Sequence, residues 1–186
     1  LNNPDELRRR VHTEFVVADL ATNPRYSYCR QYPGELKLIL SLADGNTRFQ
    51  LSDEQLDQCP LSIDELFYYG QMNTDNVAVD RVEQVGPLTS LTTRSVYISA
   101  KAANVPALMS RFQVHAPHGL FLMAPMCHLL CYSPVDPAHI LQQLMAVIHT
   151  IRYPMAAASR TPGMLLSRDI VYYSPEGTYE TITQDD

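Results

Sequence analysis

Residues 115–134, which read HAPHGLFLMAPMCHLLCYSP, are rich in the side chains that most readily bind metals or act as nucleophiles. The imidazoles and thiols of this segment belong to His115, His118, His128, Cys127 and Cys131. Two kinds of chemistry would use such a set. Thiolates with an imidazole would hold a zinc ion, or one thiol beside an imidazole would act as a nucleophile.

The spacing of the two thiols argues against a metal centre. Residues 119–124 and 128–133 are mostly apolar and predict two paired strands around Pro125–Met126. Along an extended chain Cys127 and Cys131 would lie about 13 Å apart, which is too far for one zinc ion or for a disulfide. We therefore expect no metal and no cofactor, and we expect both thiols to be packed as small apolar groups.

Catalytic chemistry would fall to Cys127, His128 and His118. Adjacent residues of a strand point to opposite faces, so Cys127 and His128 would face away from each other and a base would have to come from elsewhere. The sequence also has no GxSxG, P-loop or GxGxxG motif. We expect a protein that is not an enzyme, with a small hydrolase or transferase that uses a Cys/His pair as the alternative.

Tyrosine is the more unusual part of the composition. Three of the eleven tyrosines fall in the last predicted hairpin, residues 170–182: Tyr172, Tyr173 and Tyr179. One face of such a hairpin is open in a two-layer fold, so we expect a ring to point outward, as at protein interfaces. This hairpin and the loop with His115 and His118 are the expected working surface of a protein-interaction or regulatory module, whose partner would be another protein or a second copy.

The charge balance limits the other partners. Fourteen basic and twenty acidic residues give a net charge of −6, which opposes binding to phosphate backbones and to anionic lipid. No stretch reaches the roughly 18 to 20 apolar residues of a membrane span, because the longest candidate is broken by Pro125 and His128. We therefore expect neither nucleic acid nor a membrane as a partner.

The four cysteines indicate a reducing compartment. They have no CxxC spacing and are few for a stapled secreted domain, so we expect reduced thiols in a cytoplasm. The sequence begins with Leu1 rather than Met, and no basic segment followed by an apolar one comes after it. We therefore expect a trimmed or mature chain.

Helical and strand signals alternate along the first half of the chain. A start at Asn3–Pro4 and apolar residues at steps of three to four predict one long helix that ends before Asn23; those residues are Leu7, Val11, Phe15 and Ala18. Residues 36–42 and 48–51 flank an Asp-Gly turn and predict a hairpin. Ser62 and Glu65 form a capping box that predicts the start of a helix.

The second half predicts a regular order of elements. These are a strand at 95–100, a helix at 104–112, the two strands around Pro125, a helix from Asp136 to Pro154, and strands at 170–173 and 178–182. The order β-α-β-β-α-β with an extra strand is that of a ferredoxin-like unit. We expect an α+β protein with one antiparallel sheet, helices on one face, and a single domain 1–186 whose sub-lobes would be 1–85 and 95–186.

Two longer runs carry a family resemblance: GLFLMAPMCHLLCYSPVDPAHILQQLMAVIHTI and MLLSRDIVYYSPEGTYETI. The positions that match are Leu122 to Pro125, His128, Val135–Asp136, Leu166–Ser167 and Val171–Tyr172, and LSIDELFYYGQMNT adds a capped helix after a hairpin. In these segments the chain resembles a bacterial group of uncharacterised domains that includes the YtpQ-like proteins. The resemblance implies an architecture and an intracellular bacterial setting, and it implies no activity, cofactor or site residue.

Overall fold

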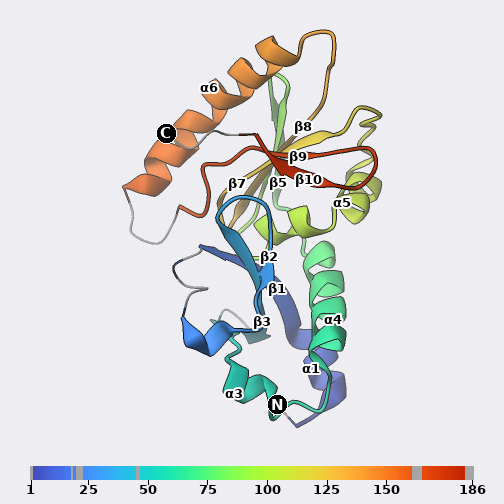
Figure 1. The fold of residues 1–186 in the computed structure, drawn as a ribbon, viewed down its shortest axis with the longest axis vertical. Coiled ribbons are helices and arrows are strands. Elements are labelled where there is room, and N and C mark those ends of the chain that lie inside the picture. Colours follow the sequence, from blue (N-terminus) through green and yellow to red (C-terminus); the bar gives the residue numbers. More distant parts are fainter. Residues whose placement is uncertain (1, 18, 20–22, 45–46, 161–164, 183–186) are drawn as a thin grey trace.

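The fold comes from a computed structural model, which describes residues 2–17, 19, 23–44, 47–160 and 165–182. Within these ranges the chain forms two antiparallel sheets and five α-helices, which confirms the α+β class. In Figure 1 the two sheets lie one after the other along the long axis of the molecule. The sheet that contains β1 (Val11–Val17) and β3 (Leu36–Asp44) is near the N-terminus, and the sheet that contains β7 (Leu120–Met126) and β8 (Leu129–Pro134) is at the other end. Two sheets are found where the sequence predicted one.

Sheet A is formed by the N-terminal strands. They are β1 Val11–Val17, β2 Arg30–Gln31, β3 Leu36–Asp44 and β4 Thr47–Gln50. Strand β3 is central, with β1 on one edge and β2 and β4 on the other. The predicted hairpin at 36–51 is confirmed as β3 and β4, and its turn residues 45–46 lie outside the described residues.

Sheet B is formed by six later strands. They are β5 Arg81–Val85, β6 Leu88–Thr92, β7 Leu120–Met126, β8 Leu129–Pro134, β9 Val171–Tyr173 and β10 Tyr179–Thr181. Their order is β10-β9-β7-β8-β6-β5, and every neighbouring pair is antiparallel. The predicted pairing of the two strands and the predicted last hairpin are thereby confirmed, although Pro125 and Met126 belong to β7 rather than to the turn.

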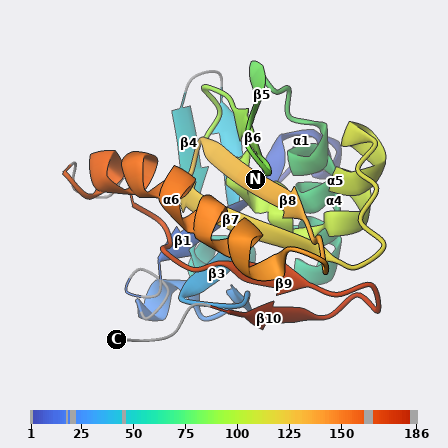
Figure 2. The same cartoon turned by 90° about the horizontal axis from the view of Figure 1, so that it is seen from above.

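The helices lie against both sheets. They are α1 Pro4–Arg10, α3 Asp53–Leu56, α4 Ile63–Asn76, α5 Val105–Phe112 and α6 Ile140–Ser159, with short 3-10 helices η1 Pro24–Tyr26 and η2 Ser99–Ala103. The capping box of Ser62 and Glu65 opens α4 as predicted. Figure 2 shows α6 running across sheet B, and α4 packs against β1.

The ferredoxin-like order is not found in the described ranges, because the expected strand at 95–100 does not form. Ser99 to Ala103 make η2 instead. This helix lies between the two sheets, and the ammonium group of Lys101 reaches the last turn of α4. Tertiary contacts on all sides of the segment therefore decide its conformation over the strand propensity of Val96, Tyr97 and Ile98.

The long first helix is also wrong, because Val11 begins a strand. Leu7, Val11 and Phe15 are spaced by four, and a spacing of four keeps residues on one face of a strand as well as of a helix. The β-branched content of residues 11–17 favours the strand, which pairs with β3 along its whole length. Only Pro4–Arg10 remain helical, with Asn3 as the N-cap.

Helix α6 differs from its prediction at both ends, since it begins at Ile140 rather than Asp136 and continues past Pro154. Val147 and Ile151 fix its position by packing on the apolar face of sheet B. A proline removes one hydrogen bond of a helix, and the packing of the preceding turns outweighs that loss here.

One hydrophobic core joins the two sheets. It includes Phe15 and Leu40 from sheet A together with Leu91 and Leu130 from sheet B. A smaller cluster lies between sheet B and α6, where Cys131 is buried. None of the helices in the described ranges combines the length and the hydropathy that a membrane crossing requires.

Candidate functional site

An open cleft of about 680 Å³ lies beside the β3–β4 hairpin. Its walls come from two segments: the hairpin supplies Ala43, Thr47 and Arg48, and the loop after β6 supplies Arg94, Ser95, Val96 and Tyr97. The volume falls within the range of small-molecule sites, roughly 300–1,000 Å³. We call it the Arg48 cleft.

The polar face of sheet A lies under this cleft. Side chains alternate between the two faces of a strand, so the register places His12, Glu14, Ser41, Arg48 and Gln50 on one face. The opposite face of sheet A, which is mostly apolar, packs on α4 and the core. Strand pairing thus gathers five polar side chains from three separate strands.

Glu14 is the buried charge of the site, with 2% of its surface exposed. Its Oε1 accepts hydrogen bonds from a guanidinium nitrogen of Arg48 at 2.6 Å and from the amide of Gln50 at 3.2 Å. Burial raises the pKa of this carboxyl, and the positive charge of Arg48 opposes the rise. The carboxylate holds Arg48 in place at the wall of the cleft.

Three buried oxygens near Glu14 stand out: Glu14 Oε2, Ser41 Oγ and the hydroxyl of Tyr97. Each is shielded from solvent and lacks a hydrogen bond of regular geometry within the described residues. Burial raises the pKa of Tyr97, a hydrogen bond with Ser41 lowers it and the charge of Glu14 raises it, so the three groups are neighbours. Ser41 also lowers the pKa of Glu14 through a hydrogen bond. The three groups thus form one buried polar cluster next to Arg48, and contacts within it offset the cost of roughly 1–3 kcal/mol that an unpaired buried polar atom carries.

An aromatic pair and a second arginine complete the surroundings. The rings of His12 and Tyr97 stack with centroids 4.4 Å apart and planes 15° apart. Burial lowers the pKa of His12, which favours the neutral ring. On the opposite wall, the backbone N–H of Arg94 donates to Asp80.

Cys127 and His128 lie close to the loop that lines the cleft, since the backbone N–H groups of Ser99 and Thr93 donate to their carbonyls. The charges of Arg48 and Glu14 also act on the pKa of Cys127. The two residues form the turn between β7 and β8, not part of a strand, and Cys127 Sγ is 3.5 Å from His128 Nδ1. The expectation that they face away from each other is therefore wrong. The predicted turn Pro125–Met126 instead belongs to β7, whose register shifts between Met123 and Met126.

The third catalytic candidate is not brought to this turn. His118 precedes β7, whereas Cys127 and His128 follow it, so the whole length of β7 separates them. His118 and His115 are exposed. The carbonyl of His118 accepts a hydrogen bond from the hydroxyl of Tyr172 at 3.1 Å, which joins the histidine loop to the last hairpin.

The three hairpin tyrosines are half-buried. Tyr172 packs on Phe121, with ring centroids 6.1 Å apart. Tyr173 and Tyr179 pack edge to face at 4.9 Å, and the hydroxyl of Tyr179 donates to the carbonyl of Ala102. These contacts occupy much of each ring, and the role of the hairpin as an interaction surface stays a prediction.

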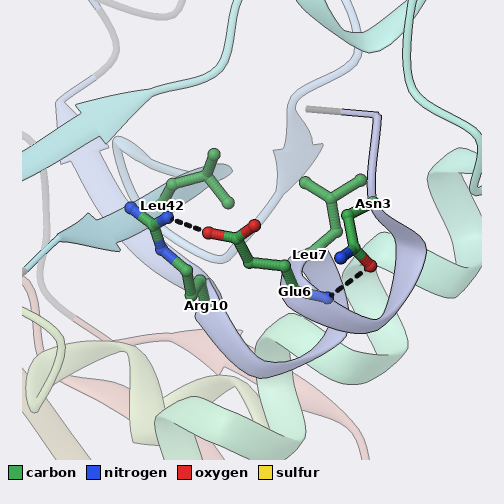
Figure 3. A pocket seen from close by; sticks show the side chains of 5 residues that line it. All are labelled: Asn3, Glu6, Leu7, Arg10 and Leu42. Atoms are coloured by element: carbon green, nitrogen blue, oxygen red, sulfur yellow. Dashed lines mark hydrogen bonds and ion pairs between the residues drawn. The ribbon is translucent and has the colours of Figure 1, made fainter.

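Two further observations concern ligand sites. No group of three His, Cys, Asp or Glu side chains in the described ranges is arranged to hold a metal ion. A small cavity of about 50 Å³ lies between α1 and β3, where Glu6 and Arg10 point toward each other and Asn3 caps the helix (Figure 3). Because those polar groups satisfy one another, this cavity offers little to a ligand.

Sequence reasoning missed Glu14, Arg48 and Tyr97. One signal for Glu14 was present: a single carboxylate stands among the apolar residues of β1. Charged residues are rarely buried without a partner, so such a position predicts a polar cluster. The partners themselves depend on strand register.

Comparisons with protein-family models, with curated proteins and with solved structures find no match for this chain. The resemblance to the YtpQ-like group stays a prediction.

Thiol-labelling reagents are expected to react slowly with Cys127 and Cys131 in the native protein. Burial raises the pKa of the Cys131 thiol to about 12 and also raises that of Cys127, and a thiol rather than a thiolate reacts poorly. Mass spectrometry after a short pulse of iodoacetamide at pH 7.5 shows the order in which the four cysteines are labelled, with the urea-unfolded protein as the reference. Labelling of Cys127 ahead of all other cysteines would show an activated nucleophile.

Replacing Glu14 with glutamine removes a desolvated charge together with its ion pair to Arg48, so the effect on the unfolding free energy is expected to depend on pH. The native pKa is raised, so the folded state binds more protons than the unfolded one and the contribution of Glu14 falls as pH rises above about 4.5. Urea unfolding at several pH values from 4 to 7 measures the unfolding free energy of the variant minus that of the wild type. This difference should increase with pH.

The exposed residue Glu176 provides the matched control for this experiment. The substitution E176Q removes an exposed carboxylate and should change the unfolding free energy at pH 7 by less than about 0.5 kcal/mol. A difference between E14Q and wild type that is constant from pH 4 to 7 would contradict the prediction.

Proposed function

We propose that this protein is a non-enzymatic binding module that takes up a small molecule in the Arg48 cleft. The observation that carries the proposal is an open cleft whose wall residue Arg48 is held by the buried carboxylate of Glu14. The hydroxyl groups of Ser41 and Tyr97 lie beside that carboxylate. The cleft has the volume of a small-molecule site.

The enzymatic alternative has one favourable observation and one unfavourable one. Cys127 and His128 are in contact, as a nucleophile and its base would be. However, burial raises the pKa of Cys127, whereas an activated cysteine has a lowered one. The balance favours binding without turnover.

Ligand-observed NMR with a library of small polar metabolites tests the proposal. We expect some compounds to bind the wild-type protein and to remain chemically unchanged during incubation. The same compounds should not bind the variant Ala43→Phe, whose larger side chain fills the cleft. The matched control is Ala156→Phe on the exposed surface of α6, which should leave binding intact. The proposal would be contradicted if no compound lost its binding in A43F, or if a bound compound were converted to a product.

A second candidate function, self-association, is favoured by the outer side of α6. Leu141 and Met145 are 74% and 73% exposed and Ile148 is 41% exposed, and their spacing places them on one stripe of the helix. Arg152 is the only Lys, Arg, Asp or Glu of α6. Arg152 lies four residues after Ile148 on the same stripe, and this face carries no carboxylate. Two copies that each carry a net charge of −6 repel least where such a face meets its equivalent.

The occupant proposed for this stripe is therefore a second copy of the chain, with the two α6 helices packed across a two-fold axis. Analytical ultracentrifugation is expected to show dimers at about 100 μM for the wild type and monomers for Met145→Lys. The control Gln142→Lys changes the charge on a neighbouring exposed position and should keep the dimer. A monomeric wild type, or dimers in M145K, would contradict self-association through α6.

A further inference from the structure

The charge of the cleft is opposite to that of the whole chain. Arg48 and Arg94 are the only charged residues among its seven lining residues. The full sequence nevertheless carries six more acidic than basic residues. Arg48 is paired with Glu14 beneath the cleft, so Arg94 supplies the positive charge in excess, and a cleft with two guanidinium groups and no carboxylate among its lining residues attracts anions.

Both arginines have hydrogen-bond donors to spare. A guanidinium has five N–H groups, and the contacts found for Arg48 use one of its terminal nitrogens on Glu14 Oε1. The side chain of Arg94 makes no hydrogen bond or ion pair within the described residues. A planar guanidinium matches a carboxylate or a phosphate with two parallel hydrogen bonds.

Glu14 fixes the position of Arg48 beneath this surface. It is buried, it accepts from Arg48 at 2.6 Å, and Gln50 holds the same oxygen. The guanidinium is thereby oriented before any ligand arrives, which lowers the entropy lost on binding. Glu14 acts as a positioning residue and does not line the cleft itself.

The remaining walls determine the size and character of the ligand. Ala43, Val96 and the ring of Tyr97 are apolar, whereas Thr47 and Ser95 offer hydroxyl groups. A volume of about 680 Å³ exceeds the needs of a bare inorganic ion. The walls suit a carbon skeleton with an anionic group at one end.

From these observations, and resting on the binding function proposed above, we infer that the ligand is a small organic anion whose carboxylate or phosphate group is held between Arg48 and Arg94. Its carbon skeleton lies against Tyr97, Val96 and Ala43. The shared chemistry is an oxyanion on an organic skeleton, and the source, a carboxylic acid or a phosphate ester, is distinguished by experiment.

Isothermal titration calorimetry on the full chain tests the inference with four probes: citrate, glycerol 3-phosphate, inorganic phosphate and glycerol. We expect citrate or glycerol 3-phosphate to bind at least about 10-fold more tightly than inorganic phosphate, and glycerol not to bind. Binding of citrate identifies a carboxylic acid as the source, and binding of glycerol 3-phosphate a phosphate ester. Affinity should fall as salt is raised, because the contact is ionic.

Two variants separate a specific site from general attraction. Arg94→Met is expected to weaken the best probe at least about 10-fold, since one of two guanidinium contacts is lost. The matched control Arg25→Met removes an exposed arginine from η1 and should leave binding unchanged. The substitution E14Q should weaken binding through the position of Arg48, and its effect on affinity should disappear in an R48M background.

The outcomes distinguish this inference from the proposed function. One outcome is that compounds bind the wild type and not A43F, and yet are neutral or bind R94M as tightly as the wild type. In that case the inferred ligand class is wrong, and the proposed binding function is still supported. Equal affinity for inorganic phosphate and for the organic anions also overturns the ligand class. If nothing in the library binds in the cleft, the proposed function itself fails.

Discussion

Replacing Gly119 with alanine is expected to lower the free energy of unfolding by about 3–5 kcal/mol. Gly119 has a φ of +94°, which side chains of L residues rarely adopt. An added Cβ would lie 2.4 Å from a ring carbon of Tyr172 and 2.5 Å from the carbonyl oxygen of Tyr173. The second contact is a backbone atom of β9, which pairs with β7 at Leu120, so relief requires a shift within sheet B.

Gly86 provides a matched control for this substitution. Its φ is +60°, and a Cβ built there meets no atom within 4 Å. The substitution G86A therefore carries the conformational cost alone, about 1–2 kcal/mol. Urea unfolding followed by tyrosine fluorescence measures both variants, and unfolding free energies that agree within about 0.5 kcal/mol would contradict a steric role for Gly119.

The elements that the sequence predicted correctly carry their signals within a few residues. Ser62 and Glu65 satisfy each other's backbone N–H groups at the start of α4, so this helix start is specified locally. The last hairpin is similar, because Gly177 supplies a positive φ in its turn and Ser174 bonds across to Thr178. Such features do not depend on the rest of the fold.

The elements that were wrong depend on distant contacts. Val11 and Phe15 satisfy both a helical and a strand period, and only β3 decides between them. Ser99 to Ala103 form η2 because Lys101 reaches α4. Nothing within either segment encodes the partner that fixes its conformation, so neither conformation could be read from local pattern alone.

The candidate site was hidden for the same reason. Glu14, Arg48 and Tyr97 are far apart in the sequence, and a strand pairing, a hairpin and a loop bring them together. The dense segment with Cys127 and His128 drew attention instead, and it lies beside the cluster. A count of reactive side chains located the neighbourhood of the site, whereas the burial of one carboxylate located the site itself.

Lys101 is the second position where a large effect is expected. Its side chain is 1% exposed, and its ammonium group donates to the carbonyl oxygens of Thr74 at 2.9 Å and Asp75 at 2.6 Å in the last turn of α4. Each carbonyl also has a second donor, the N–H of Val77 for Thr74 and a guanidinium nitrogen of Arg111 for Asp75, so Lys101 completes the cap of this turn. Lys101→Ala is expected to cost about 3–5 kcal/mol of unfolding free energy, because it leaves a cavity and removes two hydrogen bonds from a charged donor.

Lys101→Met separates the two causes, because methionine keeps most of the volume and loses the donors; its expected cost is about 2 kcal/mol.

The cost of this substitution should also depend on pH. Burial and then the charge of Arg111 lower the pKa of Lys101 from 10.5 to about 8, while Asp75 opposes the shift. Between pH 8 and 10.5 the unfolded state therefore binds more protons than the native state, and the contribution of Lys101 to stability rises with pH. The cost of K101M, measured by urea unfolding, should grow across this window. A cost of K101M that stays level from pH 8 to 10.5 would mean that the native ammonium group is not destabilised by its burial.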